Sequence, residues 1–294
     1  MKRNLLLLVL VFSTFFGVSQ ELSPYFKITE TDSEISVINT QIKEALSQNG
    51  FFVIGEYAVA KNENLFVTCF TSNELKDLSL QFKDRGALAS VLKVGFVKKD
   101  GKTTVSILNP EYMFMAYWGE QLKGQEDQLM AISNKVKATF SGFGEAEPFG
   151  GTVEKDDLAD YHYMMMMPYF DDPDELNEFD SFEEGLATIR KNLEAGKGNT
   201  VKVYEQIFEG KEIAIFGVGL LDTEDGESHF LPIIGEDHVA NMPYEIILQG
   251  KEASSLPGKY RIALFWPSLT MGQFMKINST PGYIKDVMEG LTED

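Results

Sequence analysis

The predicted secondary structure repeats on the two sides of a glycine-rich segment, residues 142–160. This segment contains four Gly, one Pro and six acidic residues with little apolar periodicity, a composition typical of a linker. The flanking regions, residues 25–141 and 161–294, predict the same succession of strands and helices. A repeat constrains the fold more strongly than any local motif, because each copy must build the same packed unit. The sequence therefore predicts an α+β protein with two similar β-α-β-β-β-β-α units.

Both copies begin with a predicted strand and a predicted helix. The strands are Tyr25 to Thr29 and Tyr161 to Tyr169. Capping-box patterns follow at residues 31–34 and 181–184, in which a hydroxyl and a Glu satisfy free backbone N–H groups. Apolar residues then recur at intervals of three and four, which indicates an amphipathic helix in each copy.

Each copy continues with two predicted hairpins rich in apolar and β-branched residues. The paired strands are, in chain order, Phe51 to Tyr57 with Leu65 to Phe70, Val91 to Phe96 with Thr104 to Leu108, Val201 to Phe208 with Ile213 to Leu221, and Tyr244 to Leu248 with Tyr260 to Phe265. Both copies then close with a strand, a Pro and a helix, which aligns Pro110 with Pro267. Proline suits the first helical position because its missing N–H would have no partner there.

Short motifs in the first copy make it similar to a known protein family. They are Gly50-Phe51-Phe52-Val53, Cys69-Phe70-Thr71-Ser72-Asn73, the turn Lys99-Asp100-Gly101-Lys102, and the strand from Ser106 to Pro110. In this order they resemble the family catalogued as domain of unknown function 302, over residues 30–118 and more loosely over residues 180–277. The resemblance implies a fold like that of the TATA-binding protein, a curved antiparallel sheet with helices on one face. It implies no reaction and no catalytic residues.

One turn of the sequence departs from that family. The Cys/Gly-Asn-Pro-like turn is broken in the first copy, and Gly217-Val218-Gly219 stands in its place in the second.

A curved sheet with helices on one face leaves its other face or its edge to be covered. We therefore expect the two units to pack against each other as a pseudo-dimer.

The N-terminus, residues 1–19, has the pattern of a secretory signal peptide. Lys2 and Arg3 precede an apolar run of about 12 residues, and Gly17 and Ser19 stand at the two small-residue positions before a cleavage point. An uncleaved anchor is the alternative, but a membrane span needs roughly 20 apolar residues. No Cys follows the apolar run, which excludes a lipoprotein anchor. We expect a soluble mature protein in the periplasm or outside the cell.

Charge and composition exclude several classes of function. Without Lys2 and Arg3 the chain has 24 basic and 45 acidic residues, and residues 150–294 alone have 11 basic and 28 acidic residues, a net charge of −17. This acidity argues against nucleic-acid binding, repels anionic lipid surfaces and concentrates cations, although it also serves solubility alone. A single Cys excludes an internal disulfide. Motifs for phosphate-binding loops, dinucleotide binding, zinc proteases and serine hydrolases are absent, and we expect no cofactor.

The segment from His229 to Gln249 contains the main candidate site. Two of the three His of the chain lie there, beside carboxylates and amides set among apolar residues. A few polar groups in an apolar frame are typical of a small-ligand pocket or a partner surface. The ligand-binding candidates are His229, Glu236, Asp237, His238, Asn241, Tyr244 and Glu245. The alternative is that the connection from Leu221 to Pro243 is a structural plug whose apolar residues complete the core.

The methionine run Met164 to Met167, next to His162, is a weaker candidate. In an oxidising compartment His and Met thioethers bind copper(I), and His162, Met164 and Met166 are the residues that one strand face would bring together. A strand buried on both faces, with Met as adaptable filler, is the favoured interpretation, and no metal site is expected. Cys69 lies in an apolar strand without a neighbouring base and is expected to be inert.

Two further acidic stretches are expected to be structural. Residues 222–227 suggest a calcium loop but lack its ligand spacing, and they are expected to form a hairpin turn. The acidic run from Asp171 to Asp180 has no matching basic run and is expected to be a solvated loop.

These observations leave three hypotheses open. The leading one is a non-enzymatic exported protein that binds a small molecule or a protein through residues 229–250 or the cleft between the copies. The second is a hydrolase or isomerase that uses His238 with Glu236, Asp237 or Glu245 as a general acid–base pair. The third is a periplasmic metal-handling protein. The sequence does not identify the ligand or the oligomeric state.

We predict that the exported form begins at Gln20 or within two residues of it. The intact mass of the protein from its native host measures this directly. A mass that includes the run from Met1 to Phe16 would contradict the prediction.

Overall fold

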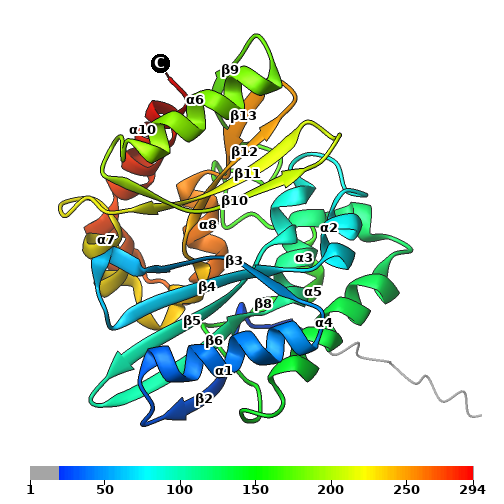
Figure 1. Ribbon diagram of the computed structural model, residues 1–294, viewed down its shortest axis with the longest axis vertical. Coiled ribbons are helices and arrows are strands. Elements are labelled where there is room, and N and C mark those ends of the chain that lie inside the picture. The colour runs from blue at the N-terminus through cyan, green and yellow to red at the C-terminus, as the bar shows by residue number, and fades with distance from the viewer. Residues whose placement is uncertain (1–19, 294) are drawn as a thin grey trace, which may run out of the picture.

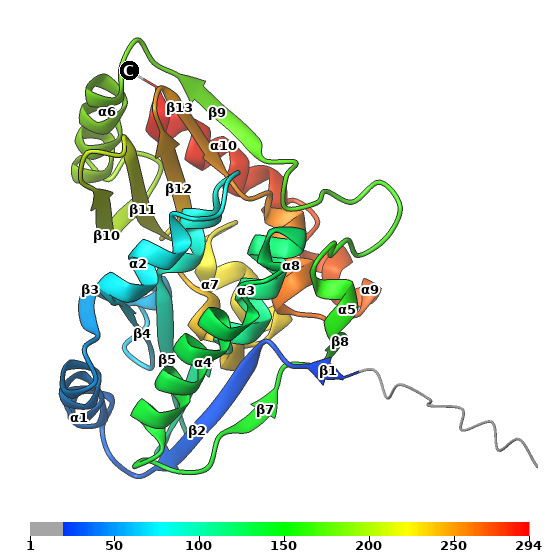
Figure 2. The ribbon, with the colours of Figure 1, turned by 90° about the vertical axis from the view of Figure 1, so that its right-hand side faces the viewer.

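Two antiparallel sheets form the core of the protein, one in each half of the chain (Figures 1 and 2). The computed structural model describes residues 20–293, so the predicted signal peptide, residues 1–19, lies outside the described residues. Both sheets have helices packed on them, and the α+β class predicted from the sequence is confirmed.

The first unit contains a six-stranded sheet and the helices that follow its strands. Its strands are β2 (Tyr25–Thr31), β3 (Phe52–Ala58), β4 (Leu65–Thr71), β5 (Leu92–Lys99), β6 (Lys102–Leu108) and the edge strand β7 (Glu147–Phe149). Its helices are α1 (Ile35–Gln48), η1 (Val59–Lys61), α2 (Asn73–Ser79), η2 (Gly86–Ser90), α3 (Pro110–Trp118), η3 (Gly119–Leu122) and α4 (Glu126–Phe140). Helices α1 and α4 contact each other, and α1 packs on β3 and β5.

The second unit contains a five-stranded sheet. Its strands are β9 (Asp174–Glu178), β10 (Thr200–Phe208), β11 (Ile213–Leu220), β12 (Tyr244–Gln249) and β13 (Glu252–Ser255). Its helices are α6 (Phe182–Glu194), α7 (Glu227–Ile234), η4 (Glu236–Asn241), α8 (Gly258–Phe265), α9 (Met271–Phe274), η5 (Met275–Ile277) and α10 (Thr280–Thr292). Between the units lie β1 (Glu21–Leu22) paired with β8 (Val153–Glu154), and the short helix α5 (Lys155–Leu158).

The two sheets share one topology. The spatial order is β3-β4-β5-β6-β2 in the first unit and β10-β11-β12-β13-β9 in the second, so each strand has a counterpart in the same place. Both sheets also have bulges at matching positions. The ladder skips Ile54 in β3 and Val203 in β10, and it skips Ile28 in β2 and Leu176 in β9. A bulge locally redirects a strand, so matching bulges give the two sheets the same bends.

An ion pair recurs at matching positions of the two units. On the first helix of each unit, Lys43 pairs with Glu56 at 3.0 Å, and Arg190 Nε donates to Glu205 Oε1 at 2.8 Å. Glu56 and Glu205 follow the same bulge in β3 and β10. The helix α1 or α6 is thus tied to the edge strand of its own sheet in the same way.

The units pack together through close backbone contacts. Gly55 in β3 lies against β10, where an added Cβ would come within 2.1 Å of the Val203 carbonyl oxygen. Gly95 in β5 lies beneath η4 of the second unit, where a Cβ would come within 2.7 Å of the Ala240 nitrogen. Glycine is required at both positions because any side chain would separate the units. Helix η4 contacts β4, β5 and β6 and so covers part of the sheet of the first unit.

A buried charged cluster lies at the centre of this interface. Lys93 in β5 pairs with Glu245 in β12, and Arg261 in α8 donates to Glu245 Oε2 at 2.6 Å. Lys93 and Glu245 are matching residues of the two units, since they pair in their ladders with the matching residues Cys69 and Gly217. Burial lowers the pKa of Lys93. Equivalent positions that meet each other are what a two-fold-like arrangement requires.

A second buried carboxylate joins the units beside this cluster. Glu227 in α7 accepts hydrogen bonds from the Tyr57 hydroxyl at 2.8 Å, the Ala60 amide at 2.8 Å and the Leu220 amide at 3.1 Å. Burial raises the pKa of Glu227 to about 7, although these three donors favour the charged form. Two of the donors belong to the first unit, so the Glu227 carboxylate forms hydrogen bonds across the interface.

Several expectations about local structure are confirmed. The first hairpin is formed by β3–β4 in the first unit and by β10–β11 in the second. The second hairpin of the first unit is formed by β5–β6. The capping box expected at residues 181–184 is half present: the Ser181 side chain caps α6 by accepting from the Glu184 amide at 3.1 Å, but the Glu184 carboxylate accepts from the Asp180 amide at 2.8 Å and not from that of Ser181. The capping box expected at residues 31–34 is wrong, because Glu34 occupies the N-cap of α1 without a side-chain cap and Thr31 still belongs to β2.

The first strand of the second unit is not where the sequence predicted it. Residues 161–169 form no strand, and β9 lies instead within the acidic run that was expected to be a solvated loop. Strand β9 is an edge strand in which Leu176 alone is buried, so its sequence carries little apolar signal. The run Met164 to Met167 looks apolar, but in place of the expected buried strand it forms a surface loop.

The last hairpin of the second unit was also predicted wrongly. Strand β12 turns at Gly250 into β13, and the predicted strand from Tyr260 to Phe265 belongs to helix α8. The counterpart of Pro110 is therefore Pro257, at the N-cap of α8, and not Pro267. A helix buried on several sides has an almost continuous apolar sequence, which periodicity alone does not distinguish from a strand.

The connection from Leu221 to Pro243 is not the long loop that the sequence suggested. It contains α7 and η4, and residues 222–226 form the turn that precedes α7 rather than a hairpin. The matching connection of the first unit contains α2 and η2. The segment 142–160, predicted to be a linker, contributes β7 to the first sheet and also contains β8 and α5.

We predict that Glu245→Gln lowers the free energy of unfolding by about 3–5 kcal/mol, because it leaves two buried cations without a counter-charge. Lys93→Met should cost less, about 2 kcal/mol or below, since Arg261 then still neutralises Glu245. Urea denaturation of the purified variants measures both. Lys102→Met, which removes an exposed pair with Glu30, is the control and should leave stability nearly unchanged. Equal losses for Glu245→Gln and Lys93→Met would contradict this account of the cluster.

Candidate functional site: an apolar pocket beneath the methionine loop

Residues 159–173 connect α5 to β9 and form a surface loop, here called the methionine loop. Figure 2 shows this connection arching along the outside of the molecule beside α8 and α9. Met165 and Met166 at its tip are 81% and 95% exposed. The tip is a tight turn in which the Met167 amide donates to the Met164 carbonyl at 3.0 Å and Met166 has a φ of +69°. A non-glycine residue in that conformation points to a turn that the rest of the loop maintains.

The base of the methionine loop is fixed to the second unit. The Tyr161 hydroxyl donates to the Ala263 carbonyl of α8 at 2.9 Å. His162 stacks on Tyr169, with ring centroids 4.5 Å apart, and so joins the two arms of the loop. These contacts hold the methionine tip over one face of α8.

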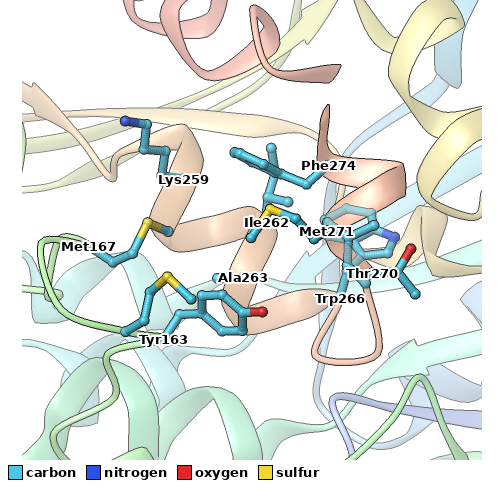
Figure 3. Close-up of a pocket in the computed structure, with 11 residues that line it drawn as sticks. Tyr163, Met167, Lys259, Ile262, Ala263, Trp266, Thr270, Met271 and Phe274 are labelled. Carbon is cyan, nitrogen blue, oxygen red and sulfur yellow. The ribbon is translucent and has the colours of Figure 1, made fainter. Parts of the chain in front are cut away.

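A pocket of about 100 Å³, here called the methionine pocket, lies between this loop and helices α8 and α9. Figure 3 shows Tyr163 and Met167 on one side of it and Met271 and Phe274 on another. The residues that line it are Tyr163, Met164, Met167, Lys259, Ile262, Ala263, Trp266, Leu269, Thr270, Met271 and Phe274. An engineered cavity of about 150 Å³ with similar apolar walls stays dry and binds benzene. The methionine pocket is therefore of a size for one apolar side chain or one small ring.

Helix geometry explains why α8 forms the floor of this pocket. Lys259, Ile262, Ala263 and Trp266 are spaced by three and four residues and so share one face of the helix. The wall formed by α9 is set by a capping box, in which Thr270 caps the Gln273 amide and the Gln273 side chain accepts from the Thr270 amide at 3.1 Å.

The only cation among the residues that line the pocket is Lys259. Figure 3 shows its amine at the outer edge of the group, away from Trp266 and Met271. Its aliphatic stem therefore contributes apolar surface while the charge stays near solvent. Met271 and Met275 are 55% and 58% exposed on the neighbouring surface and extend the apolar rim. Methionine is flexible and polarizable and adapts to differently shaped apolar groups.

The structure separates the seven residues predicted to bind a ligand. His238, Asn241, Tyr244 and Glu245 are buried, whereas His229 and Glu236 are half-buried and Asp237 is exposed. Three of the buried residues gather around Arg261 of α8. Arg261 donates to Asn241 Oδ1 at 2.9 Å and to Glu245, and it lies 4.2 Å from the centroid of the Tyr244 ring. This burial supports the alternative that the segment completes the core, and a ligand-binding role for it stays a prediction.

His238 forms the pair that the enzyme hypothesis needs, but in an enclosed place. Its Nδ1 lies 2.8 Å from Asp237 Oδ1, and its Nε2 is buried without a hydrogen-bond partner among residues 20–293. The ring is surrounded by Tyr25, Phe149 and Trp266, with centroids 5.0, 5.7 and 5.6 Å away. A general base must reach the proton that it removes, and the buried Nε2 is not accessible to a substrate in this structure.

Trp266 separates His238 from the methionine pocket. One side of its indole ring stacks on His238, with an angle of 20° between the planes, and the residue also lines the pocket. Its Nε1 has no hydrogen-bond partner in the described part of the chain. The predicted polar segment and the pocket are thus neighbours that share one aromatic wall.

The weak metal candidates do not gather around one point. His162 stacks on Tyr169, Met164 lines the pocket, and Met166 points into solvent at the tip of the loop. Within residues 20–293, no group of three or more His, Cys, Asp or Glu side chains is placed to hold a metal ion. Cys69 is fully buried, and burial raises the pKa of its thiol, as expected for an inert cysteine.

Sequence analysis missed the methionine pocket for an identifiable reason. Residues 260–265 were assigned to a strand, so residues 259, 262, 263 and 266 were not recognised as one helical face. Their spacing of three and four residues was the signal that would have indicated a helix.

No protein-family model matches the sequence, and no curated protein matches it. Among solved structures the chain is similar to the crystal structure of an uncharacterized conserved protein, DUF302, from Bacillus stearothermophilus. The sequences are 11% identical, the match covers 41% of this chain and 98% of that chain, and the TM-score is 0.34. Among the described residues, no helix is long and apolar enough to span a membrane.

We predict that His238→Ala lowers the free energy of unfolding by about 2 kcal/mol or more, because it opens a cavity among Tyr25, Phe149 and Trp266. Glu236→Ala is the neighbouring control, and its half-buried side chain should cost little. Thermal and urea denaturation measure both changes. If His238→Ala left stability unchanged but abolished binding of a ligand, the segment would be a site and not a plug.

Proposed function

We propose that this protein is an exported, non-enzymatic binding protein that accepts an apolar group of its ligand in the methionine pocket. The observation that carries the proposal is the combination of an apolar pocket with exposed methionines around it. Apolar side chains that gather beside a pocket, two of them 81% and 95% exposed, form the kind of patch that marks a binding surface. Burying one such side chain contributes about 1.5–3 kcal/mol.

The architecture supports a binding role over catalysis. The polar groups with paired charges, including Glu245 and Arg261, are used within the interface between the units. The methionine pocket presents one hydroxyl from Tyr163 and one from Thr270 and no carboxylate or imidazole among its lining residues. General acid–base chemistry needs a titratable group within hydrogen-bond reach of the substrate, and this pocket offers only the Tyr163 hydroxyl and the outward amine of Lys259, with no partner among the lining residues to activate either.

We also propose that the chain is a tandem of two units with a common origin, each of the kind described as domain of unknown function 302. The common strand order and the two pairs of matching bulges support this proposal. Export through cleavage of residues 1–19 belongs to the same proposal and rests on the signal-peptide pattern alone.

Binding of a neutral apolar probe tests the proposed function. We predict that N-phenyl-1-naphthylamine, whose phenyl ring is of a size for the pocket while its naphthyl group would lie on the methionine rim, binds saturably, with brighter probe fluorescence and altered emission of Trp266. The double variant Met164→Gln with Met167→Gln should weaken the binding about five-fold or more, because polar amides replace thioethers on the pocket wall. Met130→Gln in α4 is the matched control and should bind like the original protein.

Two outcomes would contradict the proposal. One is the absence of saturable binding by correctly folded protein, as judged from circular dichroism. The other is equal weakening by the pocket variant and by Met130→Gln. Trp266→Phe identifies the reporter, because the chain contains only one other Trp, residue 118.

A further inference from the structure

An acidic hollow adjoins the methionine pocket. Its volume is about 550 Å³, and it lies between β8, α5 and the start of the methionine loop. Its lining residues include five carboxylates and no Lys or Arg. They are Glu21, Thr152, Val153, Glu154, Asp156, Asp157, Asp160, Tyr161, His162, Tyr163 and Pro267. The hollow is therefore a site of concentrated negative charge on the surface.

The carboxylates of the hollow are not neutralised by the protein. Among residues 20–293, no ion pair involves Glu154, Asp156, Asp157 or Asp160. Lys155 is the one basic residue in this stretch, and it pairs with Glu111 of α3 at 2.7 Å. Glu21 accepts a hydrogen bond from the Thr152 hydroxyl at 3.1 Å.

The hollow and the methionine pocket are continuous along the surface. Tyr163 lines both, and Pro267 of the hollow directly follows Trp266 of the pocket. Met164 lies on the pocket side of Tyr163, whereas His162 lies on the side of the hollow. A ligand that places an apolar group in the pocket therefore extends naturally over a field of carboxylates.

We propose that the occupant is a basic peptide segment that inserts one apolar side chain into the methionine pocket and places Lys or Arg over the acidic hollow. This inference rests on the proposed function and names the class of partner. The pocket holds about one side chain, and the exposed Met165, Met166, Met271 and Met275 offer an adaptable apolar rim for its neighbours. Charge complementarity selects the basic partner, since carboxylates repel acidic ones.

The same charge disfavours the other occupants. A second copy of this chain would have to bring its own acidic surface against the hollow, because residues 150–294 have a net charge of −17. An anionic lipid surface is repelled for the same reason. Lys259 lines the methionine pocket but is not among the residues that line the hollow, so its cation does not compensate the hollow.

Short synthetic peptides test the inference on the full mature chain. The probe is a capped peptide with one Leu flanked by Lys on both sides, and its two controls replace both Lys by Glu or the Leu by Ser. Isothermal titration calorimetry at low salt should show the Lys–Leu–Lys peptide binding at least about ten-fold more tightly than either control. The advantage over the Glu peptide should disappear near 1 M NaCl, where the Debye length is about 3 Å.

A charge-neutralised variant locates the effect. Asp156→Asn, Asp157→Asn and Asp160→Asn together should weaken binding of the Lys–Leu–Lys peptide about ten-fold and leave binding of N-phenyl-1-naphthylamine unchanged. The matched control neutralises three exposed carboxylates elsewhere, by Glu209→Gln, Glu212→Gln and Glu224→Gln, and should bind the peptide normally.

The results separate this inference from the proposed function. If the neutral probe binds but the three peptides do not differ, the inference fails and the proposed function stands. If neither the probe nor any peptide binds, both fail. Self-association that Met165→Gln abolishes, or sedimentation with vesicles of anionic lipid, would also overturn the inference, because the occupant would then be a second copy or a membrane.

Discussion

Burial of one unit against the other dictates how the sheets, the helices and the buried charges of this protein are arranged. Each sheet has helices on one face, and its remaining face and edge need a cover that excludes water. The second unit supplies that cover through η4, and the close approach at Gly55 and Gly95 leaves no room for intervening side chains. Charged groups that are buried there must be paired, and Glu245 forms ion pairs with both Lys93 and Arg261.

This constraint also explains where the proposed binding surface lies. The segment from His229 to Gln249 looks like a site in the sequence, yet two of the seven residues predicted there to bind a ligand, Asn241 and Glu245, are already hydrogen-bonded in the buried cluster. Asn241 and Glu245 are hydrogen-bonded to Arg261, and Glu227 joins Tyr57 and Ala60 of the first unit. Groups that must remain paired to stabilise a buried interface are not free to take part in binding.

The tip of the methionine loop takes no part in the packing of one unit against the other. The loop joins the two units but lies outside both sheets, and although Tyr161 and Phe170 at its base pack into the core, the methionines at its tip do not. Its base is fixed to α8 by Tyr161, while Met165 and Met166 stay in solvent. A rigid base that carries an adaptable apolar tip is a usual arrangement for recognition loops on folded scaffolds.

Local patterns in the sequence specify the α+β class, the repeated order of elements and most hairpins, because alternating apolar residues and turn residues act locally. Contacts made only after folding turn the acidic run into the edge strand β9 and residues 258–265 into a buried helix. They also leave Met165 and Met166 of the methionine loop in solvent. These outcomes depend on which surfaces meet after folding. An edge strand needs no apolar face, and a helix enclosed on several sides has no polar one, so local patterns do not distinguish them. For the same reason the methionine pocket appears only when α8, α9 and the loop come together.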